Sequence, residues 1–381
     1  MPIYRIDGEK KGGLQKYRVV VNYTDAAGIK RRVERRVYGK GAAEQAESEM
    51  RKKAAEEREE PASGSGRMTV EDLWKLYREE KMSDIRASTM AKKDSVLRVH
   101  VLPFLGKTPL RELTREKLLD WRAHLAKKQN KTNTKNGAYR ELRALLNFAA
   151  ERGLIREAPM KYVPTFRDPY LETAPAKLRY YTKDQYGRYI AEAEKWAAGR
   201  SDLRSKGIWL FFEIAYLTGM RKGEINALRW SDLEEGYVWV RRSLTQKLKG
   251  QKWVETPPKT PSSTRRLQMP KQLREDLEAH RRLQKTAPGW SEAFFVCGGP
   301  EPIPDTTLEK ANEAFAKAAE LPRITIHEFR HSHASLLCNA GINIKEIARR
   351  LGHADVEMTL KTYSHLYPKE EERAVTVLDD I

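Results

Sequence analysis

Several residue types that define whole classes of protein are scarce in this sequence. It has 2 cysteines, Cys297 and Cys338, which are too few for a framework of disulfides. It has no uninterrupted apolar run of about 20 residues, the length that a membrane-spanning helix needs. Its first residues, MPIYRIDGEKKGG, lack the apolar core of a secretory signal. The sequence therefore argues against a disulfide-rich secreted protein or a membrane protein, and predicts a protein of the reducing cytoplasm.

Basic residues, in contrast, are in large excess. The chain has 72 Lys and Arg residues against 53 Asp and Glu residues, which gives a formal net charge of +19. Such an excess attracts polyanions, because binding releases the counterions condensed around them. The composition favours DNA or RNA as a partner. It carries no information on sequence preference, and a ribosome-associated or merely soluble basic protein would share it.

Composition and periodicity divide the chain into three expected domains. Residues 1–58 contain two strand-like stretches separated by the turn-prone segment DAAG and followed by a charged helix. The linker PASGSG leads to residues 67–157, in which apolar residues recur at helical spacing. A proline-rich connector then leads to residues 178–381, where helices are combined with a small β-element. The predicted fold class is mainly α with small β-sheets.

Local signals place the individual elements. Strands are expected at residues 17–23, 32–38, 237–244 and 266–269. In the second domain Thr69 and Ser88 are candidate N-caps of two helices, and Thr114 begins a third. Helices of the third domain are expected at residues 186–197, 207–218, 271–284, 306–319, 327–339 and 344–351.

Cations cluster at two places outside the third domain. Four arginines lie on or directly before the expected second strand, which are Arg31, Arg32, Arg35 and Arg36. A sheet bearing them could enter a DNA groove as β-ribbon proteins do, and a solvated charged hairpin explains them equally well. Basic residues also lie near helix starts or on polar faces of the second domain; these are Lys92, Lys93, Lys131, Lys135 and Arg140. Each alone is an ordinary surface charge, but their number favours a surface that clamps DNA phosphates.

The last third of the chain carries one tyrosine, Tyr363, among conspicuous cations. These are Arg221 in LTGMRKGE, His327 and Arg330 in HEFRHSHASLL, and His353 in LGHADVEMTLKTYSHL. His327 and Arg330 are three positions apart and share one face of a helix, from which His331 is expected to point away as a packing or capping residue. Gly352 is a candidate C-cap that would turn the following histidine back over the same pocket.

These residue types in one pocket suit cleavage of a phosphodiester. A phenol has a pKa of about 10, and nearby cations would lower it and favour the attacking phenolate. Arginine forks match the charge that spreads over the phosphoryl oxygens, and the set has no acidic cluster of the kind that binds Mg²⁺. We therefore expect DNA strand cleavage through a phosphotyrosine, without a metal or nucleotide cofactor. Lys259 in TPPKTPSSTRRL is a candidate proton donor to the leaving 5′ oxygen, although a loop lysine in solvent is the simpler interpretation.

Four segments together, LTGMRKGE, TPPKTPSSTRRL, HEFRHSHASLL and LGHADVEMTLKTYSHL, resemble the tyrosine recombinases, the phage-integrase family. The resemblance implies six catalytic residues, which are Arg221, Lys259, His327, Arg330, His353 and the nucleophile Tyr363. It also implies that Glu224 buttresses Arg221 and does not touch the phosphate. Tyr367 is the weaker candidate for the nucleophile.

The resemblance further implies an architecture and a set of partners. Residues 1–58 are similar to a three-stranded arm-binding domain, residues 67–157 to a helical core-binding domain that closes a clamp around the duplex, and residues 178–381 to a mixed α/β catalytic domain. The implied function is integration or excision of a mobile element through a 3′-phosphotyrosyl intermediate. The implied partners are double-stranded DNA attachment sites, a homo-tetramer assembled on DNA, an excisionase and a DNA-bending protein.

Three other functions stay open on the sequence alone. They are a type IB topoisomerase, a recombinase of the Xer type that resolves chromosome dimers, and a regulator that binds DNA without catalysis. The arm-like first domain favours an integrase over the first two. The terminal segment YPKEEERAVTVLDDI has an amphipathic pattern. The resemblance implies that it docks on a neighbouring protomer, and packing within its own chain is the alternative.

Overall fold

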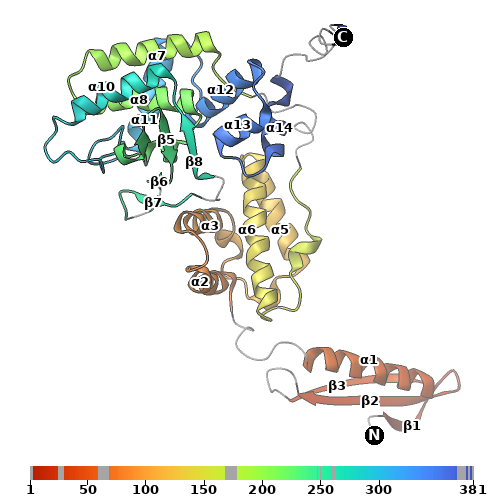
Figure 1. The fold of residues 1–381 in the computed structure, drawn as a ribbon. Helices are drawn as coiled ribbons and strands as arrows, with labels where there is room; N and C mark the ends of the chain where they lie inside the picture. The colour runs from red at the N-terminus through yellow and green to blue at the C-terminus, as the bar shows by residue number, and fades with distance from the viewer. Residues whose placement is uncertain are drawn as a thin grey trace. The chain divides into compact units, whose positions relative to one another are not determined.

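The computed structural model describes residues 3–24, 30–58, 68–167, 178–246, 248, 250–258, 263–366, 375, 378 and 379. The chain divides into two compact units, Met1–Thr173 and Ala174–Ile381 (Figure 1). The expected fold class is confirmed, since helices dominate and the strands form small antiparallel sheets. The division into three domains stays a prediction. Within the described residues, none of the helices combines the length and the apolar character needed to cross a membrane.

The first unit begins with an antiparallel sheet and a helix. Its elements are β1 (Ile3–Lys11), β2 (Leu14–Thr24), β3 (Lys30–Tyr38) and α1 (Lys40–Arg58). The strands are ordered β1-β2-β3, and α1 lies along one face of the sheet (Figure 1). Alternation along β2 turns Val19, Val21 and Tyr23 towards this helix, where they pack on its alanines and Met50. The alternation of residues along β2 thus leads to a sheet of which one face is covered by α1.

The pairing of β2 with β3 divides the four arginines of β3 between two faces. Arg31 and Arg35 lie opposite inward-facing residues of β2, on the side that α1 covers, and Arg35 binds Glu49 of α1 at 3.0 Å. Arg32 and Arg36 lie on the other side. The ion pairs on that side join Glu34 to Arg18, Arg32 and Arg36 at 2.8, 3.8 and 3.4 Å. Each face of the sheet therefore carries two of the four arginines that are predicted to bind DNA.

The rest of the first unit is helical. Its elements are α2 (Val70–Lys81), α3 (Ala87–His100), α4 (Leu102–Leu105), η1 (Leu110–Glu112), α5 (Arg115–Lys127), α6 (Thr132–Glu151) and η2 (Pro159–Tyr162). Trp121 is buried at the centre of their core and donates its indole N–H to a backbone carbonyl of α3 at 2.9 Å. Thr69 caps α2 and Thr114 caps α5, as predicted. The prediction for Ser88 is wrong, because α3 begins at Ala87 with Arg86 as its N-cap and places this serine inside its first turn.

The second unit surrounds one central helix. Its first half contains α7 (Lys183–Ala198), α8 (Leu203–Thr218), α9 (Lys222–Asn226), η3 (Trp230–Asp232), β4 (Leu233–Glu234), β5 (Tyr237–Val240), β6 (Ser243–Thr245), β7 (Val254–Thr256) and β8 (Arg265–Gln268). Its second half contains α10 (Lys271–Gln284), α11 (Asp305–Ala318), α12 (Ile326–Asn339), α13 (Ile344–Leu351), α14 (Val356–Tyr363) and η5 (Ser364–Leu366). The apolar helix α8 is buried on nearly every side and contacts α7, α10 and α12. Strands β4, β5 and β8 form one sheet, and β6 pairs with β7.

Two glycines in left-handed backbone end helices beside the cationic residues. Gly219 ends α8 at a φ of 67°, and Gly352 ends α13 at a φ of 65°. A Cβ at Gly219 would lie 2.6 Å from the ring of His333, and one at Gly352 would lie 3.0 Å from Arg265. Glycine is therefore required at both turns for its conformation and for the space it leaves.

Candidate active site

Arg221 is fixed at the start of α9 by the carboxylate of Glu224. The backbone N–H and the side-chain Nη1 of Arg221 each donate to this carboxylate at 2.9 Å. The Arg221 side chain keeps 38% of its surface exposed, whereas Glu224 is buried. The carboxylate thus holds the arginine in place while part of the guanidinium stays accessible to a ligand. This agrees with the expectation that Glu224 buttresses Arg221.

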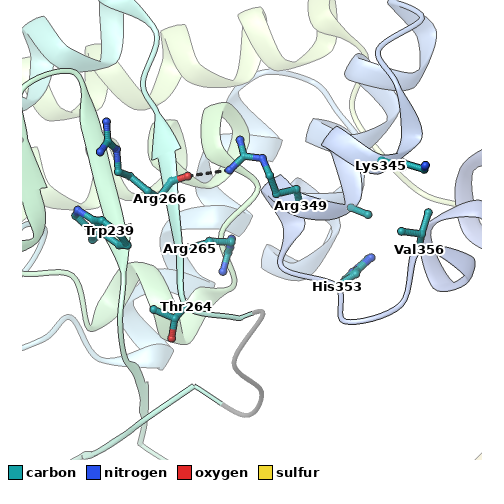
Figure 2. A pocket seen from close by; sticks show the side chains of 9 residues that line it. Trp239, Thr264, Arg265, Arg266, Lys345, Arg349, His353 and Val356 are labelled. Atoms are coloured by element: carbon teal, nitrogen blue, oxygen red, sulfur yellow. Dashed lines mark hydrogen bonds between the residues drawn. The ribbon is translucent and has the colours of Figure 1, made fainter.

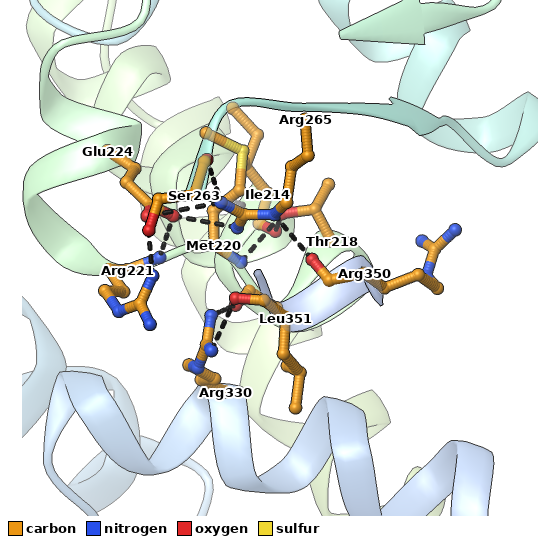
Figure 3. A network of polar contacts seen from close by, with 11 residues as sticks. Ile214, Thr218, Met220, Arg221, Glu224, Ser263, Arg265, Arg330, Arg350 and Leu351 are labelled. Carbon is orange, nitrogen blue, oxygen red and sulfur yellow. Dashed lines mark hydrogen bonds and ion pairs between the residues drawn. The ribbon is translucent and has the colours of Figure 1, made fainter. Parts of the chain in front are cut away.

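Glu224 has a second partner, Arg265 of β8, which the sequence analysis missed. The Arg265 guanidinium bonds both carboxylate oxygens, at 2.9 and 3.3 Å, and its Nε donates to the carbonyl of Arg350 at 2.6 Å (Figure 3). Burial works to raise the pKa of Glu224, but the charges and hydrogen bonds of Arg265 and Arg221 outweigh it and hold that pKa below its ordinary value. The sequence signal was the alternation of β8, which turns Arg265 inward together with Leu267.

We expect loss of Arg265 to destabilise the second unit strongly. The variant Arg265→Met leaves the buried carboxylate of Glu224 with one exposed partner, and breaking a buried ion pair typically costs roughly 3–5 kcal/mol. Urea unfolding at neutral pH measures the change. Arg266→Met on the exposed side of the same strand is the matched control; it loses only the stacking of its guanidinium on the ring of Tyr237, and its midpoint should change far less. Equal midpoints for the two variants would show that the buried pair contributes nothing.

Arg330 of α12 forms hydrogen bonds to the C-terminal ends of two other helices, α8 and α13. Its Nη1 donates to the carbonyl of Gly219 at 2.9 Å, and its Nη2 donates to the carbonyl of Leu351 at 2.5 Å (Figure 3). The residue is 3% exposed. Burial, aided by the charges of Arg221 and Arg265, lowers the pKa of Arg330 to about 9, so it remains cationic at neutral pH. The influence of Arg221 on this pKa indicates that the two predicted catalytic arginines, Arg221 and Arg330, belong to one cationic cluster.

His353 joins this cluster from the turn after α13. Its Nδ1 lies 2.7 Å from the hydroxyl of Thr359. Burial first, and then the charges of Arg330, Arg221 and Arg265, lower the pKa of His353 to about 4. The imidazole is therefore neutral at pH 7. A neutral ring beside the arginines can still donate one N–H to an anionic ligand.

A surface pocket of about 500 Å³ opens beside His353 (Figure 2). Its lining includes the basic residues Arg265, Arg266, Lys345 and Arg349. Arg349 of α13 donates to the carbonyl of Arg266 at 3.2 Å, which joins the helix to β8 (Figure 2). The positive charge of this pocket suits an anionic ligand such as a phosphate.

Tyr363, at the end of α14, is 2% exposed and packs on apolar residues of α12 and α13. Burial raises its pKa to about 12, and the charge of Arg330 opposes this shift without overcoming it. The expected lowering by a nearby cation is present, but in the DNA-free protein burial outweighs it and the net shift is upward. Removal from water disfavours the phenolate more than the neighbouring cation favours it. The phenol is protonated and covered in this state.

His331 contacts the hydroxyl of Tyr363, contrary to the expectation that it points away. Its Nδ1 lies 2.6 Å from the phenolic oxygen. The ring of His327 meets that of His331 edge to face, with centroids 5.2 Å apart. Residues four positions apart share a helix face as surely as residues three apart, so the spacing of His327 and His331 was the signal that could have identified this contact.

The described residues do not include every predicted site residue. Lys259 and the rival tyrosine, Tyr367, lie outside them, and so does most of the terminal segment. Of the lysines nominated for DNA contact, Lys93 is bound to Glu141 at 2.6 Å and lies over the ring of Tyr77. Lys135 donates to the carbonyl of Ala126 at 2.7 Å. The other two are Lys92 and Lys131, both exposed. All four remain predictions, and the two exposed lysines are the better placed to reach a phosphate.

Comparison with known proteins shows the family to which the chain belongs. Residues 179–370 match the model of the phage integrase family, and residues 69–126 match that of the phage integrase N-terminal SAM-like domain. The chain is 26% identical over 349 residues to the ICEBs1 integrase of Bacillus subtilis (strain 168), with 88% of each chain covered.

Solved structures of integrases have the same fold. The Tn1549 transposon integrase in complex with transposon right end DNA is similar with a TM-score of 0.64 and 22% identity, over 81% of this chain and 98% of that one. A lambda integrase dimer bound to a COC′ core site is similar with a TM-score of 0.57 and 17% identity, over 97% of this chain and 95% of that one.

The fold and the matched segments define a class of enzyme that cleaves DNA strands and transfers them. The chain belongs to the phage integrase family. It is a tyrosine recombinase, and its function is the site-specific recombination of mobile elements.

Proposed function

We propose that Tyr363 attacks a phosphodiester in an attachment site and forms a 3′-phosphotyrosyl link with release of a 5′-hydroxyl. The observation that carries this proposal is the cationic cluster of Arg221, Arg330 and His353, which three separate segments contribute next to α14. Such a cluster stabilises the charge that develops on the phosphoryl oxygens in the transition state. The hydroxyl of a partner strand then reverses the step, so the energy of the phosphodiester bond is conserved.

Each residue of the proposed site has a separate role. Arg221, Arg330 and His353 hold the phosphate by donating hydrogen bonds to its oxygens. Lys259 protonates the leaving 5′ oxygen, and His327 assists proton transfer. Neither a metal ion nor a nucleotide is required in this scheme, because the arginines supply the positive charge.

Binding of DNA must also uncover the nucleophile, because Tyr363 is 2% exposed in the free chain. An opening of the apolar packing around Tyr363 would expose the phenol to a phosphate held by the arginines. This requirement would confine activity to an assembled complex. We propose that this complex is a homo-tetramer on two double-stranded attachment sites. An excisionase and a DNA-bending protein are proposed as further partners that set the direction of recombination, in the cytoplasm where the DNA is accessible.

Contacts outside the site are proposed to hold the DNA. Arg32 and Arg36 lie on the face of the sheet that α1 does not cover, and Lys92 and Lys131 lie on the exposed surface of the helical group. Such cations would add sequence-independent affinity and make binding weaken with salt.

Covalent capture of DNA tests this proposal. The protein is incubated with a nicked duplex that carries the DNA flanking its own gene, in the presence of EDTA, and we expect an adduct that survives SDS. The tryptic peptide of residues 362–369 contains both Tyr363 and Tyr367. Fragmentation of the adducted peptide in a mass spectrometer must therefore assign the modified tyrosine. Absence of an adduct, a requirement for added metal, or modification of another residue would contradict the proposal.

A further inference from the structure

The hydroxyl of Tyr363 has one close polar neighbour on α12. Its oxygen lies 2.6 Å from Nδ1 of His331, and the ring centroids are 5.8 Å apart. The two residues come from different helices that pack on each other, α12 and α14. In the proposed reaction Lys259 protonates the leaving oxygen and His327 assists proton transfer, whereas the group that takes the proton of the attacking phenol is not assigned.

The charge states of the pair set the direction of the hydrogen bond. Burial, followed by the influence of His327, lowers the pKa of His331 to about 4, so the imidazole is neutral at pH 7. Burial raises the pKa of Tyr363 to about 12, so the phenol is protonated. The phenol must then donate, and Nδ1 must accept, which leaves the ring proton of His331 on Nε2. An acceptor lone pair is thereby aimed at the proton that has to leave.

We propose that His331 is a catalytic residue that takes the proton of Tyr363 during strand cleavage and returns it during strand joining. This inference rests on the proposed role of Tyr363 as the nucleophile. In cleavage the phenolic O–H bond breaks and an N–H bond forms at Nδ1, while the oxygen bonds to phosphorus and the 5′ oxygen leaves with a proton from Lys259. In joining, the incoming 5′-hydroxyl returns its proton to Lys259 as its oxygen attacks phosphorus, and the departing phenolic oxygen recovers its proton from His331.

The groups around the pair determine how it responds to a bound phosphate. From α12 they are His327, Glu328, Arg330 and Cys338. A phosphate anion held by the arginines would favour the imidazolium form of His331 and so raise its pKa. The affinity of the phenolic oxygen for a proton falls as this oxygen bonds to phosphorus. Both changes reduce the difference between the pKa values of His331 and Tyr363 during the attack.

Substitutions at His331 separate proton transfer from mere positioning. His331→Asn keeps a hydrogen-bonding amide near the position of Nδ1 but cannot accept a proton at neutral pH, and His331→Ala removes both properties. Single-turnover cleavage of the nicked duplex at saturating protein measures the rate between pH 6 and pH 9. We expect both variants to cleave roughly 10²- to 10⁴-fold more slowly than wild type. We also expect their rates to rise with pH, and added imidazole to restore part of the activity of His331→Ala.

Controls make each outcome decisive. His365→Asn removes an exposed histidine of η5 and should cleave at the wild-type rate. Melting temperature and DNA affinity verify that the variants are folded and bind. If His331→Asn cleaves at the wild-type rate, the contact only positions the tyrosine and this inference is overturned; a fully active His331→Ala overturns it as well. If the wild-type protein forms no adduct at Tyr363, the proposed function itself fails, which is a different result.

Discussion

Tyr363→Phe is expected to abolish the covalent adduct and all recombination while leaving the protein folded. The ring of Tyr363 packs on Ala334, Cys338 and Leu351, and phenylalanine keeps that packing. Only the hydroxyl and its hydrogen bond to His331 are lost, at a cost of about 1 kcal/mol in the free energy of unfolding. The adduct is measured on a denaturing gel, stability by urea unfolding, and DNA affinity by gel shift. We expect affinity to stay at the wild-type value.

The neighbouring tyrosine provides the matched control for this variant. Tyr367→Phe should form the adduct as rapidly as wild type, since its hydroxyl has no part in the proposed site. Adduct formation by Tyr363→Phe would disprove the assignment of the nucleophile. If Tyr367→Phe formed no adduct while Tyr363→Phe still formed one, the nucleophile would be Tyr367.

The helices that carry the site were predictable because their signals are local. The expected helix at residues 344–351 has the same bounds as α13, and that expected at 327–339 differs from α12 by one residue at its start. Thr325 caps α12 and Gly352 ends α13. Caps and glycine turns act within a few residues, so a single sequence contains what is needed to locate them.

The electrostatics of the site were not predictable, because they depend on packing between distant segments. The sequence places cations near Tyr363, which suggests a lowered pKa. The structure buries the phenol between α12 and α13, and burial reverses the sign of the shift. For the same reason Arg265 was missed: its partner Glu224 lies 41 residues earlier in the chain.

The β-element was predicted in part. The expected strand at residues 237–244 is divided into β5 and β6, with Arg241 and Arg242 between them. Arg242 binds the buried carboxylate of Asp232 at 2.9 Å, and Arg241 lies 4.0 Å from the same oxygen. Two consecutive side chains of a regular strand point to opposite faces, so both cannot approach one carboxylate without a break. The alternating pattern alone carries no information on this ion pair.

Loss of Arg330 is expected to reduce both catalysis and stability. Arg330→Ala removes one of the two arginines proposed to hold the phosphate, and the loss of such a group typically lowers the rate roughly 10³- to 10⁵-fold. It also leaves the carbonyls of Gly219 and Leu351 without their donor, at a cost of about 1–3 kcal/mol in the free energy of unfolding. Single-turnover cleavage and urea unfolding measure the two effects. Arg323→Ala, which breaks an exposed ion pair with Glu309, is the control and should leave the cleavage rate unchanged.

Arg330→Lys distinguishes the geometry of the guanidinium from its charge. A guanidinium donates from a rigid planar fork, so Arg330 bonds two carbonyls on different helices and keeps further N–H groups for a ligand. An ammonium group on a flexible stem supplies the same charge from a single nitrogen. We therefore expect the lysine variant to cleave roughly 10²-fold or more below wild type, even at saturating DNA. A lysine variant that is as active as wild type would show that Arg330 acts through charge alone. A variant that recovers its rate only at high DNA concentration would place its role in binding, because a group that acts in the transition state lowers the rate of the bound complex.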